Sequence, residues 1–144
     1  MQNNTDSHRP LLLVEDNPLD VDLTKRAFKK RHFINPIEVV RDGEEALDFM
    51  KRWEKGDPLP LIVLLDLKLP KVDGLEVLRQ FKTHDDFSVV PVVVLTSSSE
   101  DHDIERAYKL GANSYIIKPV DFDKFVSVAS EIEIYWLATT TLPR

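Results

Sequence analysis

The fold is decided by the segment Leu61-Ile62-Val63-Leu64-Leu65-Asp66-Leu67-Lys68-Leu69-Pro70. Its first five residues form an apolar run without polar alternation, which is typical of a strand buried on both faces of a helix-covered parallel sheet. Asp66 closes the run, and an unpaired charge at the interior end of a sheet is costly unless another group compensates it. The segment therefore predicts a buried strand with a polar site at its end.

Four more short apolar runs lie on either side of this strand: Leu11–Val14, Ile37–Val40, Val92–Leu95 and Tyr115–Ile117. The segments between and after the runs have helical spacing and cover about residues 18–31, 44–55, 75–84, 100–110 and 121–137. Five alternations of strand and helix predict an α/β fold, a doubly wound five-stranded parallel sheet with helices on both faces. The commonest strand order for such a sheet is 2-1-3-4-5.

Residues at the helix ends support these boundaries. Asp42 and Asp73 each precede a predicted helix and are followed three residues later by Glu45 and Glu76, which predicts two capping boxes with Asp in place of Ser or Thr. Gly111 follows a helix where a left-handed C-terminal residue is expected.

Length and composition indicate one globular domain. The chain has 144 residues, 25 acidic against 19 basic, and no cysteine. Without clustered positive charge we expect no binding to nucleic acid, and without cysteine no disulfide or thiolate site. No apolar run approaches the roughly 20 residues that span a bilayer, and the polar N-terminus does not resemble a signal peptide. We predict a cytoplasmic protein without membrane contact, with a flexible tail over residues 1–9, a domain over 10–137 and a second tail over 138–144.

The strand ends carry a set of reactive side chains. In a doubly wound sheet, ligands bind beyond the carboxyl ends of the strands, at the switch point between strands 1 and 3. Glu15 and Asp16 follow the first strand, and Asp66 ends the third. Three carboxylates in one place repel one another, which raises at least one pKa. A hard divalent cation removes that repulsion, and a few oxygen ligands with retained waters suit Mg²⁺.

Two further residues suggest what such a site could do. A carboxylate beside Mg²⁺ can attack a phosphoryl group in line. Lys118, after the fifth strand, can supply an ammonium for the phosphoryl oxygens, and Thr96, after the fourth, can supply a hydroxyl donor. The pattern predicts phosphoryl transfer onto Asp66.

The whole set resembles the signature of the response-regulator receiver family, whose fold is flavodoxin-like. The resemblance covers about residues 10–131 and includes Asp66-Leu67-Lys68-Leu69-Pro70 followed by Asp73-Gly74. The residues that carry it at the strand ends are Glu15-Asp16, Asp66, Thr96, Tyr115 and Lys118-Pro119.

The resemblance implies a role for each of these residues. Asp66 would be the phosphoacceptor. Asp16, Asp66 and the backbone carbonyl of Lys68 would ligate Mg²⁺ directly, and Glu15 would act through a bound water.

The remaining residues would form the switch. Thr96 would move toward the phosphoryl group, Tyr115 would turn inward into the space vacated, and Lys118 would pair with the phosphate. The Lys118–Pro119 bond would be cis. The family also implies a single-domain response regulator of a two-component phosphorelay rather than an enzyme. Its phosphodonor would be a phosphohistidine on a histidine kinase, and its output would be protein contacts.

Each residue alone also has an ordinary structural explanation. Asp16 could cap a helix, Thr96 and Tyr115 could be ordinary strand residues, Lys118 could be solvated, and Pro119 could begin a helix. Only their conjunction at one edge of the sheet favours a functional site.

Two other functions remain as alternatives on the same type of fold. An aspartate-nucleophile phosphatase of small phosphate esters would usually have a second Asp two residues after the nucleophile, where this chain has Lys68. A flavodoxin-like cofactor carrier would need a phosphate-binding loop after the first strand. The acidic Glu15-Asp16-Asn17 there would repel a phosphate.

The last predicted helix is apolar around more than one face, so one face cannot bury all of it. Either the extension folds back on its own domain, or it forms a contact between molecules. We predict a homodimer with Tyr135, Trp136 and Leu137 near the contact.

A narrower resemblance concerns the kinase. Glu15-Asp16-Asn17-Pro18 with Asp20, the Pro70-Lys71 turn and the ending Tyr135-Trp136-Leu137 … Thr141-Leu142-Pro143 are similar to receivers paired with phytochrome-type histidine kinases. That resemblance implies a light-sensing kinase as the phosphodonor.

Overall fold

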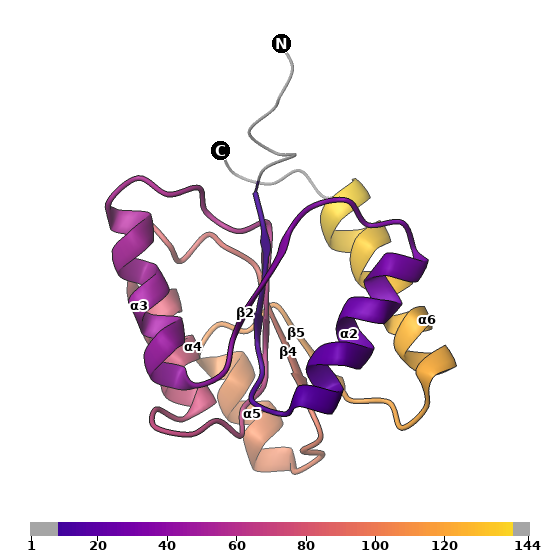
Figure 1. Cartoon of the computed structure of the whole chain (residues 1–144). Helices are drawn as coiled ribbons and strands as arrows, with labels where there is room; N and C mark the ends of the chain where they lie inside the picture. Colours follow the sequence, from indigo (N-terminus) through magenta and orange to yellow (C-terminus); the bar gives the residue numbers. More distant parts are fainter. Residues whose placement is uncertain (1–8, 140–144) are drawn as a thin grey trace.

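A computed structural model describes residues 9–139, with side chains as far as Trp136. Strands and helices alternate along the described chain (Figure 1). The strands are β1 (Leu11–Val14), β2 (Ile37–Val40), β3 (Ile62–Leu65), β4 (Val92–Thr96) and β5 (Ser114–Ile117). The helices are α2 (Pro18–Lys30), α3 (Gly43–Glu54), α4 (Gly74–Thr83), α5 (Asp101–Lys109) and α6 (Phe122–Ile132), and a π-helical segment, η1 (Glu133–Thr139), continues α6.

The five strands form one parallel sheet in the order β2-β1-β3-β4-β5, which confirms the predicted fold. The register pairs Val14 of β1 with Leu65 of β3, so the residues that follow these strands emerge side by side. All carboxyl ends of the strands lie at one edge of the sheet, the lower edge in Figure 1.

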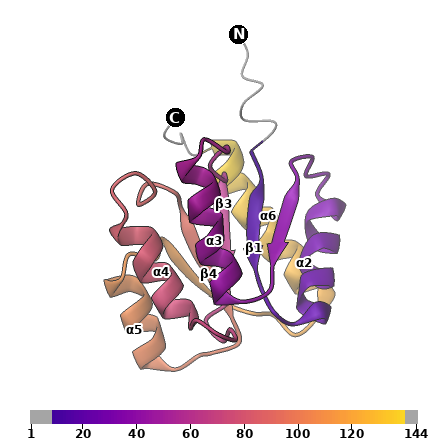
Figure 2. The same ribbon diagram turned by 60° about the vertical axis from the view of Figure 1, so that its left-hand side comes forward.

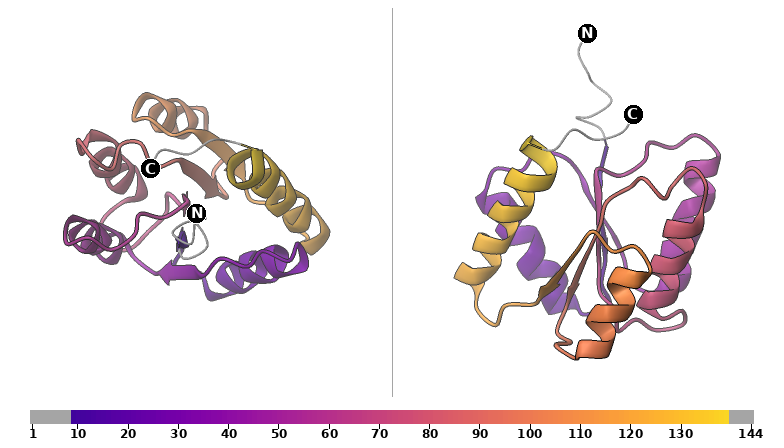
Figure 3. Two further views of the ribbon diagram at one scale, coloured as in Figure 1. Left: turned by 90° about the horizontal axis from the view of Figure 1, so that it is seen from above. Right: turned by 180° about the vertical axis from the view of Figure 1, so that it is seen from behind.

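Helices cover both faces of the sheet. In Figures 2 and 3, α3, α4 and α5 lie on one face, and α2 and α6 lie side by side on the other. Neighbouring strand residues face opposite sides: Leu12 packs in the core beneath α3–α5, and Leu13 packs in the core beneath α2 and α6. Because both faces are buried, the central strands β1 and β3 are apolar at every position, as their unbroken runs predicted.

One of the two predicted capping boxes forms in part. Asp42 accepts a hydrogen bond from the Glu45 backbone N–H (2.8 Å), but the Glu45 carboxylate accepts from the backbone N–H of Arg41, one residue before the cap. Asp73 caps α4, but the prediction that Glu76 folds back to it is wrong. Glu76 instead binds Arg79 within the helix, because a guanidinium offers its carboxylate two charged donors.

The predicted tails lie largely outside the described residues, which leave out residues 1–8 and 140–144. Arg9, placed in the N-terminal tail by the sequence, contacts the folded domain. Its side chain donates to the backbone carbonyls of Leu59 (2.9 Å) and Pro60 (3.1 Å). Arg9 is therefore part of the folded domain among the described residues.

The last helix changes character along its length. It is α-helical to Ile132 and π-helical from Glu133, whereas one continuous helix was expected. Trp136 packs partly buried against the core beneath α2 and α6, while Ile134 and Tyr135 are 52% and 61% exposed. The extension thus folds back in part and leaves apolar surface exposed. None of the helices in residues 9–139 has the length and apolar character needed to cross a membrane.

Candidate functional site

Three carboxylates meet at the carboxyl ends of β1 and β3. The Asp66 backbone N–H donates to the Val14 carbonyl (3.0 Å), which continues the ladder and brings Asp66 level with the end of β1. Oxygens of Glu15, Asp16 and Asp66 all lie within 4.8 Å of one another. Glu15 and Asp66 are buried, and Asp16 is exposed. The sequence-predicted acidic cluster is therefore assembled, with one carboxylate open to solvent.

The ammonium of Lys118 lies inside this cluster. Lys118 follows β5, and its backbone N–H donates to the carbonyl of Thr96 (2.7 Å) at the end of β4. Its Nζ lies 2.7 Å from Glu15 Oε1 and 3.0 Å from Asp66 Oδ2. The side chain is 9% exposed. The ammonium is thus a buried counter-ion placed directly on the predicted acceptor.

Asp20 is a fourth carboxylate of the site, and the sequence analysis did not place it there. It lies in the first turn of α2, and its Oδ2 accepts a hydrogen bond from Lys118 Nζ (2.8 Å). The available signal was an acidic residue four positions after Asp16, at the start of a helix that begins at this edge. That spacing alone does not reveal which group the side chain reaches.

Burial and charge set the ionisation of the cluster. Burial raises the pKa of Glu15 to about 7, against the opposing effect of its hydrogen bond from Lys118, and the nearby charge of Asp66 adds to the rise. Burial acts to lower the pKa of Lys118, but hydrogen bonds to Asp20 and Glu15 outweigh it and hold that pKa above its ordinary value. The site therefore has more negative charge than its one ammonium can balance.

Thr96 carries an unsatisfied hydroxyl near the acceptor. It is the last residue of β4 and is fully buried, and its Oγ1 has no hydrogen-bond partner among the described residues. A buried hydroxyl without a partner costs about 1–3 kcal/mol. An anion bound beyond the strand ends could satisfy this donor, so the observation fits a phosphoryl group at Asp66.

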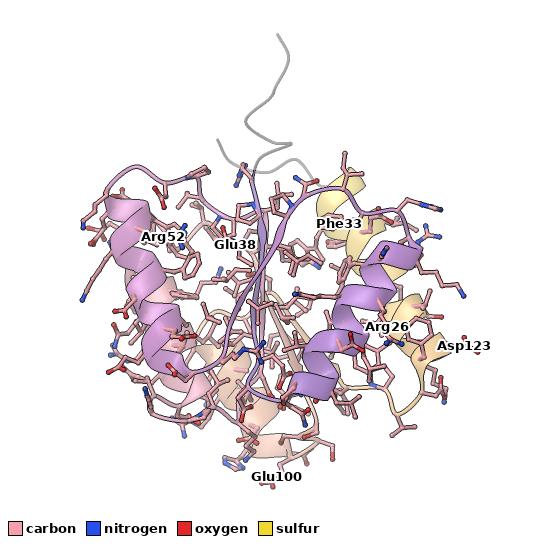
Figure 4. All side chains as sticks on the ribbon, in the orientation of Figure 1. Arg26, Phe33, Glu38, Arg52, Glu100 and Asp123 are labelled. Carbon is pink, nitrogen blue, oxygen red and sulfur yellow. The ribbon has the colours of Figure 1, made fainter. Side chains whose placement is uncertain are left out.

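Tyr115 joins β5 to the loop between β4 and α5. Its hydroxyl donates to the Ser98 carbonyl (2.9 Å), and the Ser98 hydroxyl donates to the buried carboxylate of Asp103 (2.6 Å). Burial raises the pKa of the Tyr115 hydroxyl. Figure 4 labels Glu100, the residue just before α5, at this same edge of the molecule. Tyr115 is therefore fixed to the loop that follows Thr96.

The turn after Asp66 folds back onto the acceptor. The Lys68 backbone N–H donates to Asp66 Oδ1 (3.3 Å), and the Gly74 N–H donates to the Leu67 carbonyl (3.0 Å). These contacts bring the Lys68 backbone, the predicted source of a carbonyl ligand, next to the cluster.

The prediction of a cis bond before Pro119 is wrong. No cis peptide bond occurs in residues 9–139, so the Lys118–Pro119 bond is trans. The trans form is intrinsically favoured for a residue before proline. With this bond in the trans form, Lys118 Nζ still lies within hydrogen-bond distance of Asp66.

The donor set fits a hard divalent cation. All the side-chain ligands are carboxylate oxygens, one of them exposed, and they lie close enough to share an ion. A small oxygen-ligated cation that keeps some waters, such as Mg²⁺, matches this set.

Comparison with known proteins agrees with the fold and the site. The family model described as the response regulator receiver domain matches residues 11–130. The fold and the strand-end cluster define a phosphorelay receiver, and the chain belongs to the response regulator receiver family. Receivers of this family are signalling switches that work with histidine kinases. The phosphatase alternative is not supported.

Three relatives illustrate the similarity. The chain is 48% identical over 134 residues to the probable methanogenesis regulatory protein FilR2 of Methanothrix harundinacea (strain 6Ac), covering 92% of this chain and 86% of that protein. It is 35% identical to the response regulator Rcp1 of Synechocystis sp. (strain ATCC 27184 / PCC 6803 / Kazusa), covering 99% of both chains. The crystal structure of Mn²⁺-bound Rcp1 superposes with a TM-score of 0.85 over 94% of this chain and 99% of that one, at 36% identity.

The third relative is a phosphorylated cyanobacterial phytochrome response regulator, RcpA. Its crystal structure has a TM-score of 0.88 and 37% identity, over 95% of this chain and 99% of that one.

Proposed function

We propose that this receiver accepts a phosphoryl group from the phosphohistidine of a histidine kinase onto Asp66. The observation that carries the proposal is the buried Asp66 carboxylate with the Lys118 ammonium 3.0 Å away and two further carboxylates beside it. A buried carboxylate with a purely structural role would need only the Lys118 ammonium to balance its charge. The extra carboxylates supply a place for a divalent cation at the acceptor.

Mg²⁺ is the cofactor that the donor set suits. Asp16, Asp66 and the Lys68 carbonyl would hold it, with Glu15 acting through a water. When bound, Mg²⁺ neutralises charge on the phosphoryl oxygens. The Mn²⁺-bound structure of the relative Rcp1 supports a divalent cation as the cofactor.

The transfer itself needs little from the protein beyond position and charge. An Asp66 oxygen forms a bond to phosphorus as the N–P bond of the phosphohistidine breaks, and the electron pair of that bond stays on the imidazole. Lys118 then pairs with a phosphoryl oxygen, and the Thr96 hydroxyl donates to another. The receiver in this way promotes its own phosphorylation, and it acts as a switch rather than on a diffusible substrate.

The signal would pass from Thr96 to Tyr115 and then to the surface. A Thr96 hydroxyl drawn to the phosphoryl group changes the loop that Tyr115 holds through the Ser98 carbonyl. Tyr115 also lines a groove of about 330 Å³ between β5, α5 and the last helix. A change at the phosphoryl group can therefore reshape a surface available to other proteins.

The kinase would approach the open side of the site. Leu19 and Val120, 64% and 95% exposed, lie next in sequence to Asp20 and Pro119. Exposed apolar side chains next to residues that line or adjoin the site suit a protein donor better than a small molecule.

We further propose that the donor is a phytochrome-type kinase, on the support of the likeness to RcpA. The stronger identity to FilR2 favours a second candidate, a kinase with a sensor for another signal. The test is transfer from each phosphorylated kinase to wild type and to Asp66→Asn, followed on phosphate-affinity gels. Faster transfer from the phytochrome-type kinase is expected, and equal rates would count against the pairing. Transfer to Asp66→Asn would contradict the acceptor assignment.

A homodimer through the last helix is the proposed assembly, supported by the exposed side chains of Ile134 and of Tyr135, the second of which lines the groove. The Leu137 side chain, also predicted at the contact, lies outside the described side chains. The cytoplasmic location and the absence of nucleic-acid and membrane partners stay predictions.

A further inference from the structure

Asp20 is held in a defined position at the start of α2. The helix begins beside the carboxyl end of β1 (Figure 1), and Asn17 caps it by accepting the backbone N–H groups of Leu19 and Asp20. Pro18 occupies the first turn, where its fixed φ and missing N–H suit a helix start. The Asp20 side chain, 21% exposed, therefore leaves a rigid backbone and reaches Lys118 Nζ at 2.8 Å.

Lys118 has as many partners as it has protons to donate. An ammonium carries three N–H donors, and Glu15, Asp20 and Asp66 lie 2.7, 2.8 and 3.0 Å from its Nζ. Two of the three are committed elsewhere in the proposed reaction. Asp66 would carry the phosphoryl group, and Glu15 would help to hold the cation through a water. Asp20 is the one partner that the reaction leaves unchanged.

We propose that Asp20 is a positioning residue, which holds the Lys118 ammonium beside Asp66 while the other two carboxylates change partners. The inference rests on the proposed phosphorylation of Asp66. The Lys118 side chain has several rotatable bonds, and among residues 9–139 Asp20 is its one partner that the reaction leaves unchanged, so its place at the phosphoryl group depends on this anchor. A favourable interaction of Asp20 with the helix dipole needs no contact with Lys118 and would predict none of the effects below.

Three variants separate the charge of Asp20, its hydrogen bond to Lys118 and its effect on helix α2. Asp20→Ala removes the anchor, and Asp20→Asn keeps an oxygen that can accept from Nζ. Asp22→Ala is the matched control, because Asp22 lies two residues further along α2, is exposed and pairs with Arg26 instead. All are labelled on Asp66 with acetyl phosphate and Mg²⁺, and initial rates are measured against donor concentration.

A second readout follows Lys118 directly. Isotope-labelled lysine gives an NMR signal for the methylene group beside the ammonium, assigned with Lys118→Arg. In wild type the two protons of this methylene should be inequivalent, because the ammonium is held by three partners. This signal is recorded without a phosphodonor, so it tests the anchor even if the chain fails to label.

We expect Asp20→Ala to label about tenfold more slowly than wild type, as for the loss of one charge-assisted hydrogen bond. The loss should fall on the maximal labelling rate. The signals of the two Lys118 methylene protons should converge toward a single chemical shift. Asp20→Asn should recover most of the labelling rate and most of the inequivalence of the two Lys118 methylene protons. Asp22→Ala should match wild type in both. An unchanged Lys118 signal in Asp20→Ala would overturn the inference, and so would equal or faster labelling of that variant. A wild type that labels neither with acetyl phosphate nor from a phosphorylated histidine kinase would instead refute the proposed function.

Discussion

Glu15 is the residue at which a proton and a cation compete. Its carboxyl group is buried between Lys118 and Asp66, and burial raises its pKa to about 7. Below that pH the group is largely neutral, and a neutral carboxyl group helps to hold a cation much less than a carboxylate does. Near neutral pH the state of the site therefore depends on which of the two binds.

Mg²⁺ affinity should accordingly rise with pH through about 7. Below the pKa, binding must release the Glu15 proton, so affinity should fall by up to about tenfold for each pH unit. Calorimetric titrations at about pH 6, 7 and 8 measure this dependence. Glu15→Gln cannot titrate and should bind Mg²⁺ with a flatter pH profile. An equally steep profile in Glu15→Gln would assign the dependence to another group.

Lys118→Ala should destabilise the metal-free protein. It leaves buried Glu15 and Asp66 without their counter-ion, and the loss of one partner of a buried pair costs about 3–5 kcal/mol. Urea unfolding measures this loss, and Mg²⁺ should restore part of it by taking over the charge. Lys124→Ala, on the exposed surface of α6, is the control and should change stability by less than about 0.5 kcal/mol. A Lys118→Ala protein as stable as that control would mean that the ammonium does not stabilise the metal-free protein.

At the scale of elements, α4 begins against the backbone of the two residues that follow β3. A Cβ added at Gly74 would lie within 3.0 Å of backbone atoms of both Asp66 and Leu67. Only glycine permits this approach, which holds the turn after Asp66 in place.

Gly74→Ala should therefore lower the unfolding free energy by about 3 kcal/mol, because backbone atoms must move apart. It should also slow labelling of Asp66. Gly56→Ala is the control: its φ of +104° makes a side chain unfavourable, but no atom lies within 4 Å of the added Cβ. That control should cost about 1–2 kcal/mol and leave labelling unchanged. If both variants label at the wild-type rate, the packing of α4 does not position the acceptor.

The strands and their end residues could be predicted from sequence because they follow from few rules. Buried parallel strands read as apolar runs, and their carboxyl ends share one edge, which placed Asp16, Asp66 and Lys118 together. Asp20 lies on a helix, where the direction of a side chain depends on the residue at which the helix begins and on how it docks. The Tyr115 bond to the Ser98 carbonyl likewise depends on a loop conformation that no local pattern encodes.

At the scale of the whole molecule, the last helix joins the core to an exposed surface. Trp136 packs partly buried against the core beneath α2 and α6, whereas Tyr135 is 61% exposed and its ring meets that of Trp136 edge-on at 4.9 Å. The two neighbouring aromatic residues thus face different environments. The predicted apolar excess of this helix is divided between side chains packed against the core and side chains that are largely exposed.

The two residues should therefore respond differently to substitution. Tyr135→Ala should weaken self-association and lower the unfolding free energy by only about 0.5–1.5 kcal/mol, the worth of its edge-on contact with Trp136. Trp136→Ala should lower that energy by about 2–3 kcal/mol, since its ring is only partly buried. Sedimentation velocity and urea unfolding give the two values. A wild type that stays monomeric at micromolar concentration, phosphorylated or not, would refute the homodimer.

The most direct test of the whole account is the intact mass of the protein after incubation with acetyl phosphate. Wild type and Asp66→Asn are compared, each with Mg²⁺ and with a chelator. We predict that wild type gains one phosphoryl group only when Mg²⁺ is present, and that Asp66→Asn gains none. A phosphoryl group gained by Asp66→Asn, or gained equally by wild type without Mg²⁺, would contradict the assignment of Asp66 and its acidic cluster.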